Sequence, residues 1–205
     1  MKHLYIEGES NWTLILLHGT GGRETDLLEF STMVDRKANI LAFRGNVIQD
    51  DQTRFFTRHA HNVFDDDSLK HEGQLLHDAL IKCTEEYGID LKKSIFIGYS
   101  NGANMAAYLT LNIENDIAGG VFLHPAYHTS LISEVSLLGK SYLITAGARD
   151  MVALAGDAYQ LKKHLELRGG STEVKLNDGP HAIMSEELME AHVWFLNLKK
   201  SLEDE

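Results

Sequence analysis

Short apolar runs alternate along the chain with longer segments in which apolar residues recur every three or four positions. The short runs have the length and composition of β-strands, and they lie at residues 3–6, 13–17, 39–43, 94–98, 117–123, 141–146 and 172–176. The longer segments have the periodicity of amphipathic helices, and they lie at residues 24–36, 68–87, 101–113, 153–168 and 185–200. This alternation predicts βαβ units, and therefore an α/β fold on a mostly parallel sheet of about seven strands with helices on both faces.

Two of these strands have the composition of central strands. Residues 13–17 and 94–98 are almost wholly apolar, as expected for strands that helices cover on both faces. Residues 45–67, by contrast, form a polar stretch between the third strand and the longest helix. We expect this stretch to be an excursion over the edge or top of the sheet, where loops that cover a substrate commonly lie.

The composition favours one ordinary globular domain. The 205 residues suffice to bury a large core, and neither a linker-like tract nor an internal repeat divides them, so we expect a single domain over residues 1–205. The single cysteine, Cys83, has no partner for an internal disulfide, and it shares an apolar helical stripe with Leu76, Leu80 and Tyr87. We therefore expect Cys83 to have a structural role in the core.

The charge balance bears on partners and location. The formal net charge is −11 and Lys and Arg form no cluster, which argues against a nucleic-acid or anionic-membrane partner. Apolar runs such as residues 13–17 are too short to cross a bilayer, so no membrane insertion is expected. Because the polar start lacks the apolar core of a signal peptide, a cytoplasmic location is expected.

A Gly-x-Ser-x-Gly pentapeptide carries the strongest candidate chemistry. Residues 98–102 read Gly-Tyr-Ser-Asn-Gly, directly after an apolar strand and directly before a helix. A serine at such a sharp strand-to-helix turn projects its hydroxyl above the sheet, and its strained backbone needs small neighbours, which Gly98 and Gly102 supply. The surrounding strand and helix, more than the five residues alone, make Ser100 a candidate nucleophile.

A serine nucleophile needs a base to take its proton and a carboxylate to orient that base. In the α/β-hydrolase arrangement the acid and then the base follow the serine, on loops after later strands. Asp150 follows the sixth predicted strand and His181 follows the seventh. We therefore expect Ser100, Asp150 and His181 to be catalytic. Asp157 is a rival acid within a predicted helix, and Asp178 has the position of a turn residue.

Backbone amides in two segments are expected to stabilise an oxyanion. The glycine-rich residues 18–22 follow a central strand, and Asn101 begins a helix whose free amides favour negative charge. We expect the amides of Thr20 and Asn101 to form the oxyanion hole. The same glycines resemble the start of a dinucleotide-binding fingerprint, but Glu24 stands at the position of its third glycine. No Gly-Lys-Ser/Thr follows for a P-loop, so nucleotide binding is not expected.

Histidine pairs raise the question of a metal site. One residue separates His59 from His61, and three separate His124 from His128. Neither pair has zincin spacing, and a single cysteine excludes thiolate-rich sites, so no functional metal is expected. His124 and His128 follow a strand at the edge that carries Ser100, where they either line the pocket or lie on the surface.

Aromatic residues are the candidates for substrate contact. Phe55, Phe56 and Tyr127 suggest an apolar acyl or aromatic site, with packing in the core as the alternative for each. Together with His124 they form the expected substrate-binding set. Because these residues lie in loops whose conformations the pattern does not specify, the substrate stays open.

These segments resemble the phospholipase/carboxylesterase family of α/β-hydrolases, in particular a branch of small bacterial carboxylesterases associated with hydroquinone stress. The resemblance covers nearly the whole chain and rests on residues 17–22, 54–56 and 98–104 and on the positions of Asp150 and His181. It implies a three-layer α/β-hydrolase fold without a large cap domain, a Ser-Asp-His triad, no cofactor, a small-molecule ester or thioester substrate, and frequently a homodimer.

Three features depart from the pattern of this branch. Pro180 directly precedes the candidate base, Arg23 stands where an acid is expected, and the loop after Asp150 lacks the usual proline. A positive charge at Arg23 would suit an acidic substrate, or it would offset a surface rich in carboxylates.

The leading prediction is a serine carboxylesterase that cleaves short-chain or aromatic carboxylic esters through an acyl-enzyme on Ser100. Thioesterase, lysophospholipase-like and lactone-hydrolase activities use the same triad and stay open. A non-catalytic protein that binds a small molecule on the same fold is the alternative from another class. The full set of triad and oxyanion residues argues against that alternative, because binding alone does not require all of them.

Overall fold

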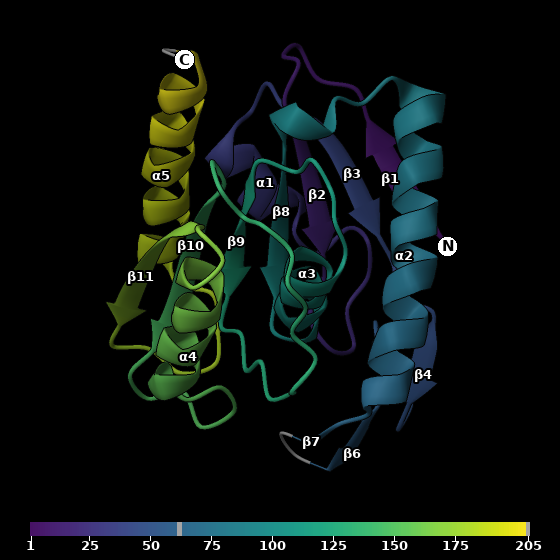
Figure 1. The fold of residues 1–205 in the computed structure, drawn as a ribbon, viewed down its shortest axis with the longest axis vertical. Coiled ribbons are helices and arrows are strands. Elements are labelled where there is room, and N and C mark those ends of the chain that lie inside the picture. Colours follow the sequence, from purple (N-terminus) through teal and green to yellow (C-terminus); the bar gives the residue numbers. More distant parts are fainter. Residues whose placement is uncertain (61–62, 204–205) are drawn as a thin grey trace.

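A seven-stranded sheet forms the centre of the computed structural model, which describes residues 1–60 and 63–203 (Figure 1). Neighbouring strands are parallel except β1, which pairs antiparallel with β3 at one edge. In spatial order the strands are β1 (His3–Ile6), β3 (Asn39–Phe43), β2 (Thr13–Leu17), β8 (Ser94–Tyr99), β9 (Gly119–Leu123), β10 (Ser141–Gly147) and β11 (Ser171–Asn177). All seven strands lie at the predicted positions.

Helices cover both faces of the sheet, so the fold has three layers (Figure 1). One face carries α2 (Asp66–Tyr87), α3 (Asn101–Asn112) and α4 (Ala155–Glu166), and the other carries α1 (Leu28–Val34) and α5 (Ser185–Glu203). A short 3₁₀ turn, Leu91–Lys93, leads into β8. The predicted three-layer α/β fold is confirmed, and no cap domain covers the described part of the chain.

The central position of β2 and β8 follows from their side chains. Every residue of β2 is buried, and its side chains alternate between the two layers of the core: Ile15 and Leu17 pack under α2 and α3, whereas Leu14 and Leu16 pack under α1 and α5. Cys83 lies buried on α2 within the first of these two cores, as its helical stripe predicts. Burial raises the pKa of its thiol.

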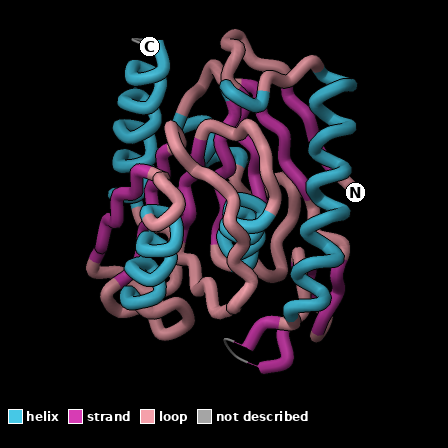
Figure 2. Tube along the Cα trace, viewed as in Figure 1, coloured by secondary structure: helices cyan, strands magenta, loops and turns pink. Residues whose placement is uncertain are grey.

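Residues 45–67 contain strands that the sequence pattern did not indicate. Two small antiparallel hairpins stand there, β4 (Val47–Gln49) with β5 (Gln52–Arg54), and β6 (Arg58–Ala60) with β7 (Val63–Phe64); both lie at the lower end of α2 (Figure 2). Asp50 and Asp51 form the first turn with φ angles of 52° and 58°. Asp tolerates this left-handed region better than most residues, so two aspartates close a hairpin without glycine.

The first helix is shorter than predicted. The periodicity predicts residues 24–36, but α1 begins only at Leu28, after a series of turns. Glu24 stays outside the helix because its buried carboxylate pairs with Lys2, just before β1, and with Arg44, just after β3. A tertiary ion pair therefore outweighs the local periodicity at this position.

None of the helices within residues 1–60 and 63–203 combines the length and the apolarity that a bilayer crossing requires.

Candidate active site

Ser100 occupies a strained turn between β8 and α3. Its φ and ψ are 53° and −112°, a region that non-glycine residues rarely adopt, and its amide donates to the Leu123 carbonyl at 2.9 Å. Both flanking glycines are required sterically. A Cβ at Gly98 would lie 2.7 Å from the Ala103 Cα, and a Cβ at Gly102 would overlap the Leu17 carbonyl. The pentapeptide thus lets α3 pack directly on the sheet while the serine hydroxyl stays accessible.

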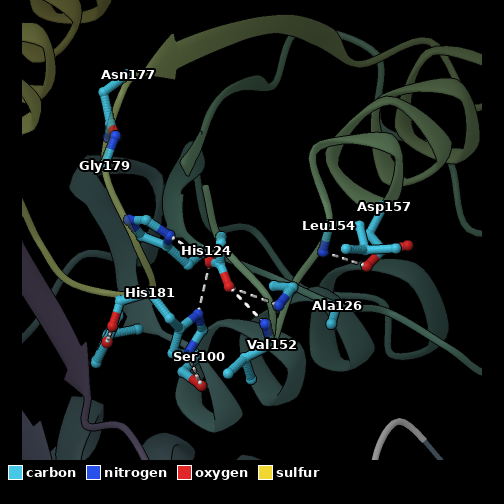
Figure 3. A network of polar contacts seen from close by, with 12 residues as sticks. Ser100, His124, Ala126, Val152, Leu154, Asp157, Asn177, Gly179 and His181 are labelled. Atoms are coloured by element: carbon cyan, nitrogen blue, oxygen red, sulfur yellow. Dashed lines mark hydrogen bonds and ion pairs between the residues drawn. The ribbon is translucent and has the colours of Figure 1, made fainter. Parts of the chain in front are cut away.

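His181 connects Ser100 to Asp150. The His181 Nε2 atom lies 2.8 Å from the Ser100 Oγ, and its Nδ1 lies 2.6 Å from the Asp150 Oδ2 (Figure 3). The carboxylate accepts from Nδ1–H, so the neutral ring leaves Nε2 free to accept the serine proton. These residues follow β8, β10 and β11, whose carboxyl ends meet at one edge of the sheet.

Four hydrogen bonds hold the Asp150 carboxylate. Oδ1 accepts from the amides of Val152 and Ala153, and Oδ2 accepts from the imidazoles of His181 and His124. Burial by itself raises the pKa of Asp150, but the bonds from Ala153, His181, His124 and Val152 outweigh it and hold the pKa below its usual value. Asp150 is therefore ionised and fixed in orientation near neutral pH.

His124 extends this network beyond the predicted triad. Its buried ring donates from Nδ1 to Asp150 at 2.8 Å (Figure 3). Its Nε2 lies 3.1 Å from the carboxylate of Glu187. Burial lowers the pKa of His124, but the hydrogen bonds and charges of Glu187 and Asp150 outweigh it and raise the pKa above its usual value. An imidazolium between two carboxylates results, and it shares Asp150 with the candidate base.

Sequence reasoning assigned Glu187 no role in the site. It lies in the first turn of α5, where acidic residues are common because they interact favourably with the helix dipole. The structure instead buries the Glu187 carboxylate, which accepts from the Met184 amide at 2.6 Å and contacts His124. The only available signal was an acidic residue soon after the candidate base, and such residues are common on surfaces.

The loop after β2 lies beside Ser100 with two backbone amides that have no acceptor. Within the described chain, neither the Thr20 amide nor the Asn101 amide donates a hydrogen bond to protein. His18 fixes this loop: its Nδ1 donates to the Gly19 carbonyl at 2.6 Å, and its Nε2 accepts from the Gly45 amide at 3.0 Å. Burial lowers the pKa of His18, so the ring is neutral, as this bonding requires.

A small, open pocket lies at Ser100. Two of the four residues predicted to contact substrate, Phe56 and His124, line it. The other two do not, because Phe55 and Tyr127 are buried in the core under α2 and α3. The Tyr127 hydroxyl donates to the Leu131 carbonyl at 2.8 Å, away from the pocket.

The rival candidates lie outside the network. Asp157 caps the start of α4 and pairs with His128 at 3.1 Å, so it does not contact the candidate base. Asp178 is an exposed turn residue, and Arg23 is an exposed residue that does not line the pocket.

Ligating atoms of His124, Asp150 and His181 lie within 4.8 Å of one another. Both imidazoles already donate to the same Asp150 oxygen, so hydrogen bonds account for this clustering without an ion. Of the other histidine pair, His59 is exposed and His61 lies outside the described residues.

Comparison with known proteins identifies the family, although no family model matches the chain. The Bacillus subtilis (strain 168) protein named "Putative hydrolase MhqD" is 34% identical over 195 residues, which are 95% of this chain and 98% of that protein. The crystal structure of the Bacillus cereus carboxylesterase is 35% identical and superposes with a TM-score of 0.93 over 97% of this chain and 94% of its own. The chain belongs to the phospholipase/carboxylesterase family of α/β-hydrolases.

A second solved structure of this kind is YahD with malic acid, which is 28% identical and covers 96% of this chain and 98% of its own, with a TM-score of 0.91. The predictions of the α/β-hydrolase fold, of the family and of a carboxylic ester hydrolase are confirmed. The roles of individual residues in this family member stay proposals.

Proposed function

We propose that this family member is a serine carboxylesterase whose nucleophile is Ser100. The observation that carries the proposal is the continuous chain of contacts from the Ser100 hydroxyl through His181 to Asp150, at the mouth of a pocket. Each contact has the length of a good hydrogen bond, and the acid and base have the chain order of α/β-hydrolases.

The geometry supports a two-step reaction through an acyl-enzyme. The Ser100 Oγ attacks the ester carbonyl carbon while His181 takes the serine proton, and the carbonyl oxygen becomes an oxyanion facing the Thr20 and Asn101 amides. The bond from the carbonyl carbon to the alcohol oxygen then breaks, and His181 gives its proton to the leaving alcohol. A water molecule then attacks the acyl carbon while His181 takes its proton, the bond from that carbon to the Ser100 Oγ breaks, and His181 returns the proton to Oγ, which releases the carboxylic acid and restores Ser100.

The pocket favours a small acyl group. Its apolar lining comes from Phe56, Phe64, Ala126, Val152 and Ala153, which suits a short-chain or aromatic ester. Malic acid, with which YahD was solved, is likewise a small molecule. Thioesters and lactones place the same electrophilic carbon before Ser100, so parallel assays with all three classes will rank these substrates.

Turnover of p-nitrophenyl acetate tests the proposed roles. Ser100→Ala and His181→Ala should each lower kcat by about 10⁴-fold or more while the proteins stay folded, because each removes a member of one catalytic unit. In the active protein kcat/KM should fall at acidic pH, since only a neutral imidazole can accept the serine proton. Full turnover in Ser100→Ala would refute the assignment, and tight ligand binding without any turnover would favour the non-catalytic alternative.

The cytoplasmic location and the homodimer stay predictions. The family resemblance supports the homodimer. A monomer has a mass of 23.0 kDa, so the molar mass from light scattering after gel filtration distinguishes a monomer from a dimer directly.

A further inference from the structure

Two arginines line the pocket at Ser100. Arg54 ends β5 and Arg58 begins β6, so the two hairpins that the sequence pattern did not predict carry both side chains into the pocket lining. Arg54 is only 3% exposed, although a guanidinium is among the costliest groups to bury. Its Nη1 donates to the Thr20 Oγ at 3.0 Å, which places the charge beside the proposed oxyanion loop.

Neither guanidinium has an acidic partner in the described chain. No ion pair there includes Arg54 or Arg58, and the buried Nε of Arg54 has no acceptor at all. The described residues that line the pocket include no Asp or Glu. In a chain with 30 acidic and 19 basic residues, carboxylates are abundant, so their absence from this wall is notable.

The electrostatics of the pocket favour an incoming anion. Burial and the neighbouring charge of Arg58 lower the pKa of Arg54, and the more distant Asp50 offsets them only in part. Arginine stays protonated in proteins, so burial leaves Arg54 with an uncompensated positive charge. A carboxylate held between the two guanidiniums would supply the missing negative charge.

We propose that Arg54 and Arg58 form a subsite for a carboxylate carried by the substrate, so that the enzyme prefers monoesters of small dicarboxylic acids. This substrate class rests on the proposed esterase function. The bound carboxylate takes no part in bond making or breaking; it orients the ester carbonyl toward Ser100 and the Thr20 loop. Arg23, whose positive charge would also suit an acidic substrate, is exposed and does not line the pocket. It is therefore not part of this subsite.

A matched pair of esters tests the preference. Monoethyl succinate and ethyl succinamate have nearly the same shape, but only the first carries a negative charge. Wild-type kcat/KM, followed by ethanol release, should be at least about tenfold higher for monoethyl succinate, chiefly through KM. Equal values for the two esters would overturn the proposal.

Variants assign the preference to the two arginines. Arg54→Gln and Arg58→Gln should each lower the ratio of the two kcat/KM values by about tenfold. Arg36→Gln, which changes an exposed arginine outside the pocket, should keep the wild-type ratio. Arg58 is only half-buried, so its variant gives the decisive result if Arg54→Gln does not fold. An unchanged ratio in Arg58→Gln and in folded Arg54→Gln would refute the assignment.

Ligand binding separates this proposal from the esterase function. Succinate should bind the wild-type protein at least about tenfold more tightly than neutral succinamide in calorimetry, and Arg58→Gln should remove the difference. That measurement needs no turnover. Absent hydrolysis with selective succinate binding would refute the esterase function alone, whereas hydrolysis of neutral esters without selective binding would refute the carboxylate subsite alone.

Discussion

Asp150 contacts two histidines that have different second partners. His181 faces the Ser100 hydroxyl with its Nε2, whereas the ring nitrogens of His124 face two carboxylates. The positive charge of His124 interacts with the same Asp150 carboxylate that must stabilise His181 once His181 has taken the serine proton. Glu187 offsets this competition, because its negative charge lies on the far side of His124.

Glu187→Gln tests this arrangement through the pH dependence of stability. Because the pKa of His124 is raised in the folded protein, its contribution to stability is complete below about pH 6.5 and is lost as the pH rises through the raised value. Replacing Glu187 removes one cause of the raised pKa. The free energy of unfolding in urea should therefore fall by about 1.5–3 kcal/mol at pH 6.

This deficit of Glu187→Gln should shrink as the pH rises from 6 to 9.5. Glu186→Gln is the matched control, because its side chain is exposed on the same turn of α5 and should change stability little at any pH. A deficit that stays constant or grows with pH would contradict the assignment of a charged His124.

At the scale of elements, the close approach of α3 to the sheet is what aims the nucleophile. The helix packs against β8 and β2, and at Gly102 no room remains for a Cβ beside the Leu17 carbonyl. The same contact holds the strained turn at Ser100 in place. Local strain at the nucleophile is therefore sustained by the packing of a whole helix.

Gly102→Ala should destabilise the protein by about 1–3 kcal/mol, because the added methyl must push α3 off the sheet, and it should lower esterase turnover with it. Gly156→Ala on α4 is the matched control, since nothing lies within 4 Å of a Cβ there and its backbone is helical. That variant should gain about 0.4–1 kcal/mol from the helix propensity of alanine. Thermal unfolding measures the Tm of both variants. Equal shifts in Tm would contradict the close packing of α3 on the sheet as the cause.

At the scale of the whole molecule, the sequence pattern predicts whatever depends on local periodicity and on the topology of parallel strands. The seven strands, the position of Ser100 and the order of Asp150 and His181 belong to this class. Contacts between distant segments do not. His124 meets Glu187 across 63 positions, and Arg54 enters the pocket only because β5 folds back on β4 in an unpredicted hairpin.

Tertiary packing also decides which of the candidate aromatic residues contact the pocket and which pack only in the core. Phe55 and Phe56 are adjacent in sequence and both are buried, yet only Phe56 also reaches the pocket. The Phe55 amide donates to the Asn101 side chain at 2.7 Å, so this residue ties the hairpin to the turn at Ser100. No periodicity in so short a segment distinguishes these two roles.

The central claim is that Ser100 is an activated nucleophile, and covalent labelling with a fluorophosphonate tests it most directly. After incubation of the folded protein with the probe, peptide mass spectrometry should find one adduct, on Ser100. Labelling should be lost in Ser100→Ala and strongly slowed in His181→Ala, because the second variant keeps the hydroxyl but lacks the base. Equal labelling of Ser100→Ala, or a folded wild-type protein that the probe does not modify, would contradict the account.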